Sequence, residues 1–186
     1  TVIASQGDGS TIDGADLSNN KQGAINCDAS TVIARESDLR AGALTGSANS
    51  VIATSGSTVN VELSDLRGLV GTNYVSGILA RQSTVIAMTA KFDYNTSSAI
   101  SSFSSTIDCA SATINRSQRG INAQKVSRIN ASNVAITNST VHGVLSQGGS
   151  IVSVDDGSVT ASATTDLRIE EGGQIFGHNC ATTAGG

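Results

Sequence analysis

Acidic residues that recur with an arginine two positions later are the part of this sequence best suited to chemistry. Asp38-Leu39-Arg40 and Asp65-Leu66-Arg67 are the closest copies, Asp16-Leu17-Ser18 is a variant, and Glu36 and Glu62 lie nearby. If the repeats stack as parallel strands, these carboxylates lie about 5 Å apart on adjacent coils and about 10 Å apart on alternate coils. Retaining glycosidases need about 5 to 5.5 Å and inverting ones about 6.5 to 9.5 Å. Asp38 and Asp65, with Glu36 and Glu62 as substitutes, are therefore candidate catalytic residues.

The same acidic pattern also has a structural interpretation. Asp and Arg side chains on neighbouring coils form a surface charge ladder, in which each pair contributes about 0 to 1 kcal/mol. A further copy, Asp166-Leu167-Arg168, favours this interpretation, because a structural motif recurs with the coil whereas an active site occurs once. Against it, stacked carboxylates would raise the pKa of one acid, as a general acid requires. Both interpretations stay open at this point.

Aromatic residues beside hydrogen-bonding groups form a second candidate site. Lys91-Phe92-Asp93-Tyr94-Asn95 places two rings beside a charge pair, and Tyr74 lies one coil earlier. Rings beside polar groups suit sugars, which have an apolar face and a rim of hydroxyls. We therefore expect a glycan-binding platform, and its residues are Tyr74, Phe92, Asp93, Tyr94, Arg40 and Arg67. The alternative is that Phe92 fills a bend in the chain and the tyrosines cover it.

Metal, cofactor and nucleic-acid chemistry find little support. Cys27, Cys109 and Cys180 match no zinc spacing, and His142 and His178 have no acidic or thiol partner at metal-binding spacing. We expect no metal and no cofactor. The net charge of −4 disfavours nucleic acid as a partner, and the lack of a long apolar run disfavours membrane insertion.

Repeated phrases indicate the elements that must position these residues. Ser30-Thr31-Val32-Ile33-Ala34 recurs as Ser83-Thr84-Val85-Ile86-Ala87, and Gly77-Ile78-Leu79 resembles Gly120-Ile121. A repeat of a little over twenty residues is typical of a solenoid. Apolar and polar residues alternate within each coil, as in the segment 58–63, which predicts short strands. The absence of proline suits a chain whose backbone N–H groups donate to the next coil.

These patterns predict an all-β, right-handed parallel β-helix of about seven coils of 20–27 residues. We expect residues 1–186 to form a single elongated domain, as a fragment of a longer chain. The second and third coils are longer, and we assign their extra residues to segments 51–56 and 70–75.

The coils that begin Ser-Thr-Ile or Ser-Thr-Val, the glycine followed by an apolar pair and the missing proline together resemble bacteriophage tailspike and tail-fibre β-helix domains, which share the pectate-lyase-like solenoid style. The segment 171–179 is similar to the closing part of such domains. The resemblance implies a virion tail appendage that recognises bacterial surface polysaccharide, either capsule or O-antigen, during host attachment. It also implies a homotrimer of solenoids side by side, with residues 171–186 leading to a C-terminal trimerisation region.

Three functions remain open from the residues. A recognition module is favoured, because most faces carry little charge and no run of aromatic residues forms a cleft. A polysaccharide depolymerase using paired carboxylates is the alternative. An ice-binding protein is the least favoured, since it needs a flat Thr-x-Thr array, whereas the threonines here are mostly single.

Overall fold

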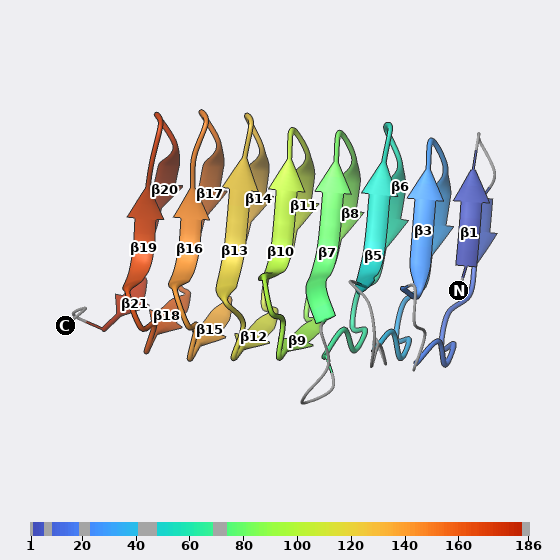
Figure 1. Cartoon of the computed structure of the whole chain (residues 1–186), viewed down its shortest axis with the longest axis horizontal. Coiled ribbons are helices and arrows are strands. Elements are labelled where there is room, and N and C mark those ends of the chain that lie inside the picture. Colours follow the sequence, from blue (N-terminus) through green and yellow to red (C-terminus); the bar gives the residue numbers. More distant parts are fainter. Residues whose placement is uncertain (1, 6–8, 19–22, 41–47, 69–73, 184–186) are drawn as a thin grey trace.

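The chain folds into an all-β parallel solenoid of about seven turns, seen in a computed structural model (Figure 1). The structure describes residues 2–5, 9–18, 23–40, 48–68 and 74–183. Within these ranges the regular secondary structure consists of strands. Each strand pairs in parallel with the corresponding strand of the adjacent coil along the axis. The predicted parallel β-helix is thereby confirmed.

Eight strands form the first long sheet, here called sheet A, which lies in front in Figure 1. In spatial order they are β1 (Val2–Ser5), β3 (Ile25–Asp28), β5 (Ala48–Thr54), β7 (Tyr74–Arg81), β10 (Ser98–Phe103), β13 (Arg119–Gln124), β16 (His142–Ser146) and β19 (Thr165–Ile169).

Sheet B is the second eight-stranded sheet and follows sheet A around each coil. Its strands are β2 (Gly9–Thr11), β4 (Thr31–Ile33), β6 (Thr58–Asn60), β8 (Thr84–Ile86), β11 (Thr106–Asp108), β14 (Arg128–Asn130), β17 (Ile151–Ser153) and β20 (Gln174–Phe176).

Sheet C closes the coil and contains five strands. They are β9 (Lys91–Asp93), β12 (Thr113–Asn115), β15 (Ala135–Thr137), β18 (Ser158–Thr160) and β21 (Ala181–Thr182). Single parallel bridges from Asp16 to Asp38, from Asp38 to Asp65 and from Asp65 to Lys91 continue this sheet toward the N-terminus.

The interior consists of side chains stacked in rows, one per coil. Sheet B contributes a row of β-branched residues, which are Val32, Val59, Val85, Ile107, Ile129 and Val152. Sheet C contributes Leu39, Leu66, Phe92, Ile114, Ile136 and Val159. In a strand, alternate side chains point into the interior. The interior of this solenoid is narrow, and it is filled mostly by medium-sized branched side chains, which strands favour, rather than by aromatic rings.

Buried serines at the corners explain why the repeated phrase Ser-Thr-Val-Ile-Ala begins with serine. At the corner between sheets A and B, the Ser83 N–H donates to Ser105 Oγ (3.2 Å), and the Ser105 N–H donates to Ser127 Oγ (3.4 Å). The Ser127 N–H donates in turn to Ser150 Oγ (3.0 Å). These side chains are at most 6% exposed, so the hydroxyls satisfy backbone donors where the chain bends inside the protein.

The glycines that begin the phrases Gly77-Ile78-Leu79 and Gly120-Ile121 lie where sheets A and C pack closely. A Cβ at Gly77 would lie 2.5 Å from the Phe92 ring, and one at Gly120 would lie 2.6 Å from Ile136 Cγ2. Any larger residue would therefore push these two sheets apart.

Two features of the predicted repeat are wrong. Segment 51–56 is not an addition to the coil, because Val51 pairs with Ile25 in sheet A and the segment continues β5 into the next corner. Most of segment 70–75 lies outside the described residues. Asp166 is not a further member of the acidic row, because it lies in β19 of sheet A.

Candidate functional site

The outer face of sheet C brings together some of the predicted catalytic and glycan-binding residues, which are Asp38, Asp65, Arg40, Arg67 and Asp93. One outward row runs through Asp16, Asp38, Asp65 and Lys91, as the bridges between them establish. The second outward row lies two residues further along each coil and consists of Arg40, Arg67, Asp93, Asn115 and Thr137. Side chains in each row repeat at about 4.8 Å, the spacing of adjacent strands.

Each of two acids in the first row is held by the arginine of its own coil. The Arg40 guanidinium donates through Nε to Asp38 Oδ1 (2.8 Å) and also forms an ion pair through Nη2 with Oδ2. Arg67 repeats this arrangement on Asp65, with Nε at 2.9 Å from Oδ1, and its backbone N–H donates to the same oxygen (3.1 Å). Both arginines keep a partly exposed edge, with side chains 38% and 46% accessible.

The electrostatics of Asp65 differ from those expected of a general acid. Burial alone would raise the pKa of this carboxyl, but hydrogen bonds from the Arg67 side chain and backbone, with the charges of Arg67 and Arg40, outweigh burial and lower the pKa. The rise in pKa expected from stacked carboxylates is therefore reversed at Asp65. The arginine fork also occupies both oxygens that a substrate would need to reach.

Glu36 and Glu62 lie at the turns between sheets B and C, beside the acidic row rather than in it. The Glu36 N–H donates to the Glu62 carbonyl oxygen (2.9 Å), so the two turns stack on adjacent coils. The Glu36 side chain is exposed and that of Glu62 is half-buried. Their assignment as substitute catalytic acids stays a prediction.

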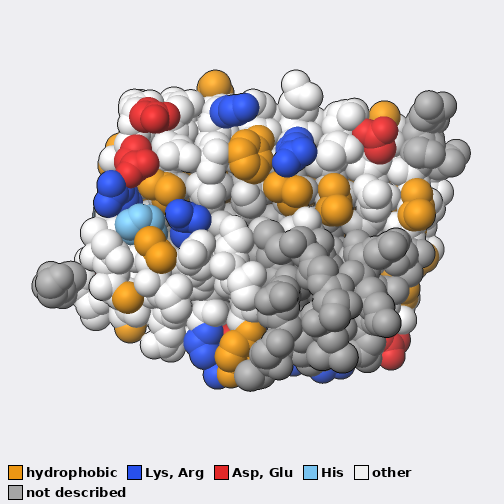
Figure 2. Space-filling view, in the orientation of Figure 1, with side chains coloured by type: hydrophobic (Ala, Val, Ile, Leu, Met, Phe, Trp, Pro, Cys, Tyr) orange, Lys and Arg blue, Asp and Glu red, His pale blue; other side chains and the backbone are white. Residues whose placement is uncertain are grey.

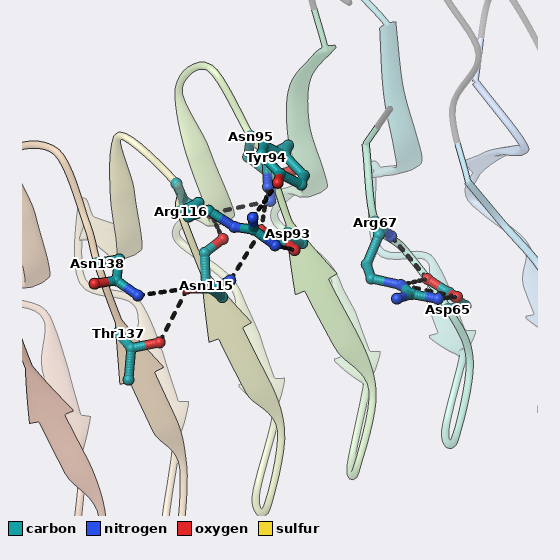
Figure 3. A network of polar contacts seen from close by, with 10 residues as sticks. Asp65, Arg67, Asp93, Tyr94, Asn95, Asn115, Arg116, Thr137 and Asn138 are labelled. Atoms are coloured by element: carbon teal, nitrogen blue, oxygen red, sulfur yellow. Dashed lines mark hydrogen bonds and ion pairs between the residues drawn. The ribbon is translucent and has the colours of Figure 1, made fainter. Parts of the chain in front are cut away.

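A polar network continues the second row toward the C-terminus (Figure 3). Arg116 donates through Nε to Asp93 Oδ1 (3.0 Å), and its guanidinium carbon lies 3.9 Å from the centre of the Tyr94 ring. The Asn115 side-chain amide donates to Asp93 Oδ1 (3.3 Å). Asn115 Oδ1 accepts in turn from Thr137 Oγ1 (3.1 Å) and Asn138 Nδ2 (3.0 Å).

This network fixes its members in one arrangement. Asp93 is only 8% exposed, which is tolerable for a carboxylate because Arg116 pairs with it. Arg116 is absent from the residues predicted from sequence. The sequence feature that could have identified Arg116 is the 22-residue offset between coils. This offset places Asn115 and Arg116 beside Asp93 and Tyr94 on the next coil.

The aromatic platform is smaller than predicted. Phe92 is 2% exposed and packs in the interior from the middle of β9, so its ring is not available to a glycan, and it fills the core rather than a bend. Tyr94 stays half-buried at the surface, with Arg116 over its ring. Tyr74 begins β7, and its side chain lies outside what the structure describes.

Four threonines form one row on the outer face of sheet B. Thr31, Thr58, Thr84 and Thr106 stack in register. The outward row two residues further on contains Ile33, Asn60, Ile86 and Asp108. These four coils therefore present no Thr-x-Thr pair.

No family model matches the chain, and neither the comparison with curated proteins nor that with solved structures finds a similar protein. The fold class therefore rests on the stacked parallel sheets themselves. Among the described residues, no three or more histidine, cysteine or acidic side chains are grouped as a metal site. The same part of the chain has no helix long and apolar enough to cross a membrane.

Proposed function

We propose that this solenoid is a carbohydrate-recognition module that binds an extended bacterial surface polysaccharide along the outer face of sheet C. The observation that carries the proposal is the second outward row, in which Arg40, Arg67, Asn115 and Thr137 offer polar groups along the rod and the buried Asp93 holds Arg116 at the surface. A polysaccharide is likewise a regular chain of hydroxyl-bearing rings, so repeated donors and acceptors can meet successive sugars.

Preorganisation supports this function. The guanidinium groups of Arg40 and Arg67 are already held by aspartates, and Arg116 is held between Asp93 and Tyr94. Side chains fixed before binding lose less conformational entropy when a ligand arrives. The exposed edges of Arg40 and Arg67 then offer N–H donors to sugar hydroxyls without a search for the correct rotamer.

Recognition is favoured over cleavage by the state of the aspartates. A glycosidase needs one carboxyl with a raised pKa as general acid, whereas the pKa of Asp65 is lowered. Arginine forks on Asp38 and Asp65 also make these carboxylates structural partners.

We further propose that three copies associate side by side in a virion tail appendage. Support comes from the outer face of sheet A, where one row carries no charge over seven coils until Arg168. Its residues are Ile3, Asn26, Ile52, Leu79, Ser101, Asn122 and Leu145. Figure 2 looks onto this sheet and shows hydrophobic side chains recurring along the rod. The first four residues of the row are exposed or half-buried, and an uncharged strip of this kind suits contact between copies of one chain.

The experiment that tests the function is a panel of extracted capsular polysaccharides and lipopolysaccharides. Retained binding and new reducing ends are measured on the same samples. We expect at least one polysaccharide to bind without release of oligosaccharide. Release that is abolished by Asp38→Asn or Asp65→Asn would replace recognition by the depolymerase function. Failure of every polysaccharide to bind would contradict both.

A further inference from the structure

A basic hollow lies at the corner between sheets A and B, away from the face of sheet C. It has a volume of about 370 Å³ and is lined by Arg81, Gln82, Phe103, Ser104 and Lys125. Arg81 and Phe103 occupy the same register position on adjacent coils, at the ends of β7 and β10. The next residues turn the corner, and stacked backbone bonds such as Gln82 N–H to the Phe103 carbonyl oxygen (2.9 Å) hold it.

The corner conformation points these side chains outward. Gln82, Ser104 and Lys125 follow directly on one register position of three successive coils, all three have positive φ, between 51° and 53°, and all are exposed. The Ser104 hydroxyl donates to the Lys125 carbonyl oxygen (2.7 Å), which ties the second coil to the third. The hollow is thus built on hydrogen-bonded corners.

The lining carries two positive charges and no acid. Among the described residues, neither Arg81 nor Lys125 forms a salt bridge, in contrast to Arg35, Arg40, Arg67, Arg116 and Arg168. Asp28 lies in the same row as Arg81 but two coils away, and it accepts a hydrogen bond from Thr54 (2.8 Å) on the coil between them. The hollow is therefore a local concentration of positive charge in a chain of net charge −4.

Phe103 gives the hollow a second kind of surface. Its ring is half-exposed, and the Arg81 guanidinium carbon lies 5.7 Å from the ring centre, within the range of a cation–π contact. An aromatic face suits the apolar face of a pyranose ring. A guanidinium beside it suits a planar carboxylate, which it can bind with two parallel hydrogen bonds.

We propose that this hollow binds an acidic sugar residue, a pyranose whose carboxylate meets Arg81 and Lys125 while its ring lies against Phe103. The inference rests on the proposed function in that the ligand is a polysaccharide, and it deepens that function by naming a uronic-acid type of sugar. The hollow is separate from the outer face of sheet C, so an experiment can disprove binding at one of them without disproving binding at the other.

The test uses a hexamer of galacturonic acid as the probe, with its fully methyl-esterified form as the uncharged control and sulfated dextran as a different anion. Binding is measured by calorimetry at low ionic strength, where exposed charges are least screened. We expect the acid hexamer to bind and the ester to bind at least about tenfold more weakly, since charge-assisted hydrogen bonds are lost. Equal binding of acid and ester, or binding of sulfated dextran alone, would overturn the assignment.

Variants locate the binding. Arg81→Gln and Lys125→Gln should each weaken the binding of the acid hexamer by about tenfold. Arg35→Gln makes the same change in net charge at an exposed arginine on a different corner, and it should leave the affinity within about twofold. An equal loss in Arg35→Gln would mean that the attraction is non-specific, and the proposal would fall. If Arg67→Ala abolishes binding of a panel polysaccharide but not of the hexamer, the two sites are independent.

Discussion

Among single residues, Asp65 shows how a repeated carboxylate takes a structural role. Its side chain is 22% exposed, and burial opposes the charged form. Arg67 supplies three side-chain hydrogen bonds and one backbone bond, which together favour the charged form more strongly. The net result is a lowered pKa, so Asp65 is an ionised partner of arginine at neutral pH.

A lowered pKa makes folding stability depend on pH in one direction. The folded state binds the Asp65 proton less tightly than the unfolded state, so the stabilisation is present above the unfolded pKa of about 3.9 and is lost as pH falls through the lower folded value. We predict that Asp65→Asn lowers the free energy of unfolding at pH 7 and reduces its decline below about pH 4. Urea unfolding of both proteins at a series of pH values measures this difference.

Arg67→Gln provides the matched comparison, because it removes the cause of the lowered pKa and leaves the carboxyl in place. Arg67→Gln should therefore also reduce the decline in the free energy of unfolding below about pH 4. An acid decline as steep in both variants as in the unchanged protein would show that Asp65 does not contribute to it.

Several residue positions could be predicted from the sequence alone. Alternation places Leu39 and Leu66 inside and the neighbouring Asp and Arg outside, and the structure agrees. The same alternation, applied to Lys91-Phe92-Asp93, would have placed Phe92 in the core. The hollow around Phe103 was harder to predict, because Gln82, Ser104 and Lys125 in its lining belong to corners, where strand alternation does not predict which way a side chain points.

For the strands, the repeat predicts parallel stacking but not which sheet a phrase belongs to. Ser50-Val51-Ile52-Ala53 reads like Ser30-Thr31-Val32-Ile33-Ala34, yet the first lies in sheet A and the second runs through β4 of sheet B. Asp166-Leu167-Arg168 likewise repeats a phrase of sheet C within sheet A. All three sheets bury alternate residues, so a short apolar phrase fits any of them.

Tertiary contacts decide between these equivalent phrases. On their own coils Gly77 and Gly120 leave room for Phe92 and Ile136 of sheet C, whereas Ser50 and Ala99 take the same register position on other coils. Asp166 is 6% exposed and accepts hydrogen bonds from the Ser162 N–H (3.0 Å) and from Thr183 Oγ1 (2.7 Å). Asp38 and Asp65 instead pair with arginines on an open face. One phrase thus has two roles, set by the surrounding coil.

Across the whole molecule, the three faces differ in what they offer. Sheet A presents an uncharged row, sheet B a row of four stacked threonines, and sheet C paired charges and amides. We predict that the protein is a trimer in solution, with the row of sheet A at the contact. Light scattering at micromolar concentration should give three times the chain mass. A stable monomer under these conditions would contradict this arrangement.

A charge placed in the uncharged row tests the location of that contact. Leu79→Glu, at a half-buried outward position in β7, should shift the assembly toward monomer, because a charge is costly to bury between copies. Thr84→Glu, at an exposed outward position in sheet B, is the control and should leave the mass unchanged. An equal effect of both changes would argue against a contact through sheet A.

The most direct test of recognition by sheet C compares two arginine variants on a polysaccharide that the panel identifies. Arg40→Ala combined with Arg67→Ala removes two preorganised donors from the outer row. Arg35→Ala removes an arginine that forms a similar ion pair with Asp13 (2.8 Å) at the corner between sheets B and C. We predict that the double variant, folded as judged by circular dichroism, loses about tenfold or more in affinity, while Arg35→Ala binds as the unchanged protein does. Full affinity in the double variant would contradict the assignment of the binding face to sheet C.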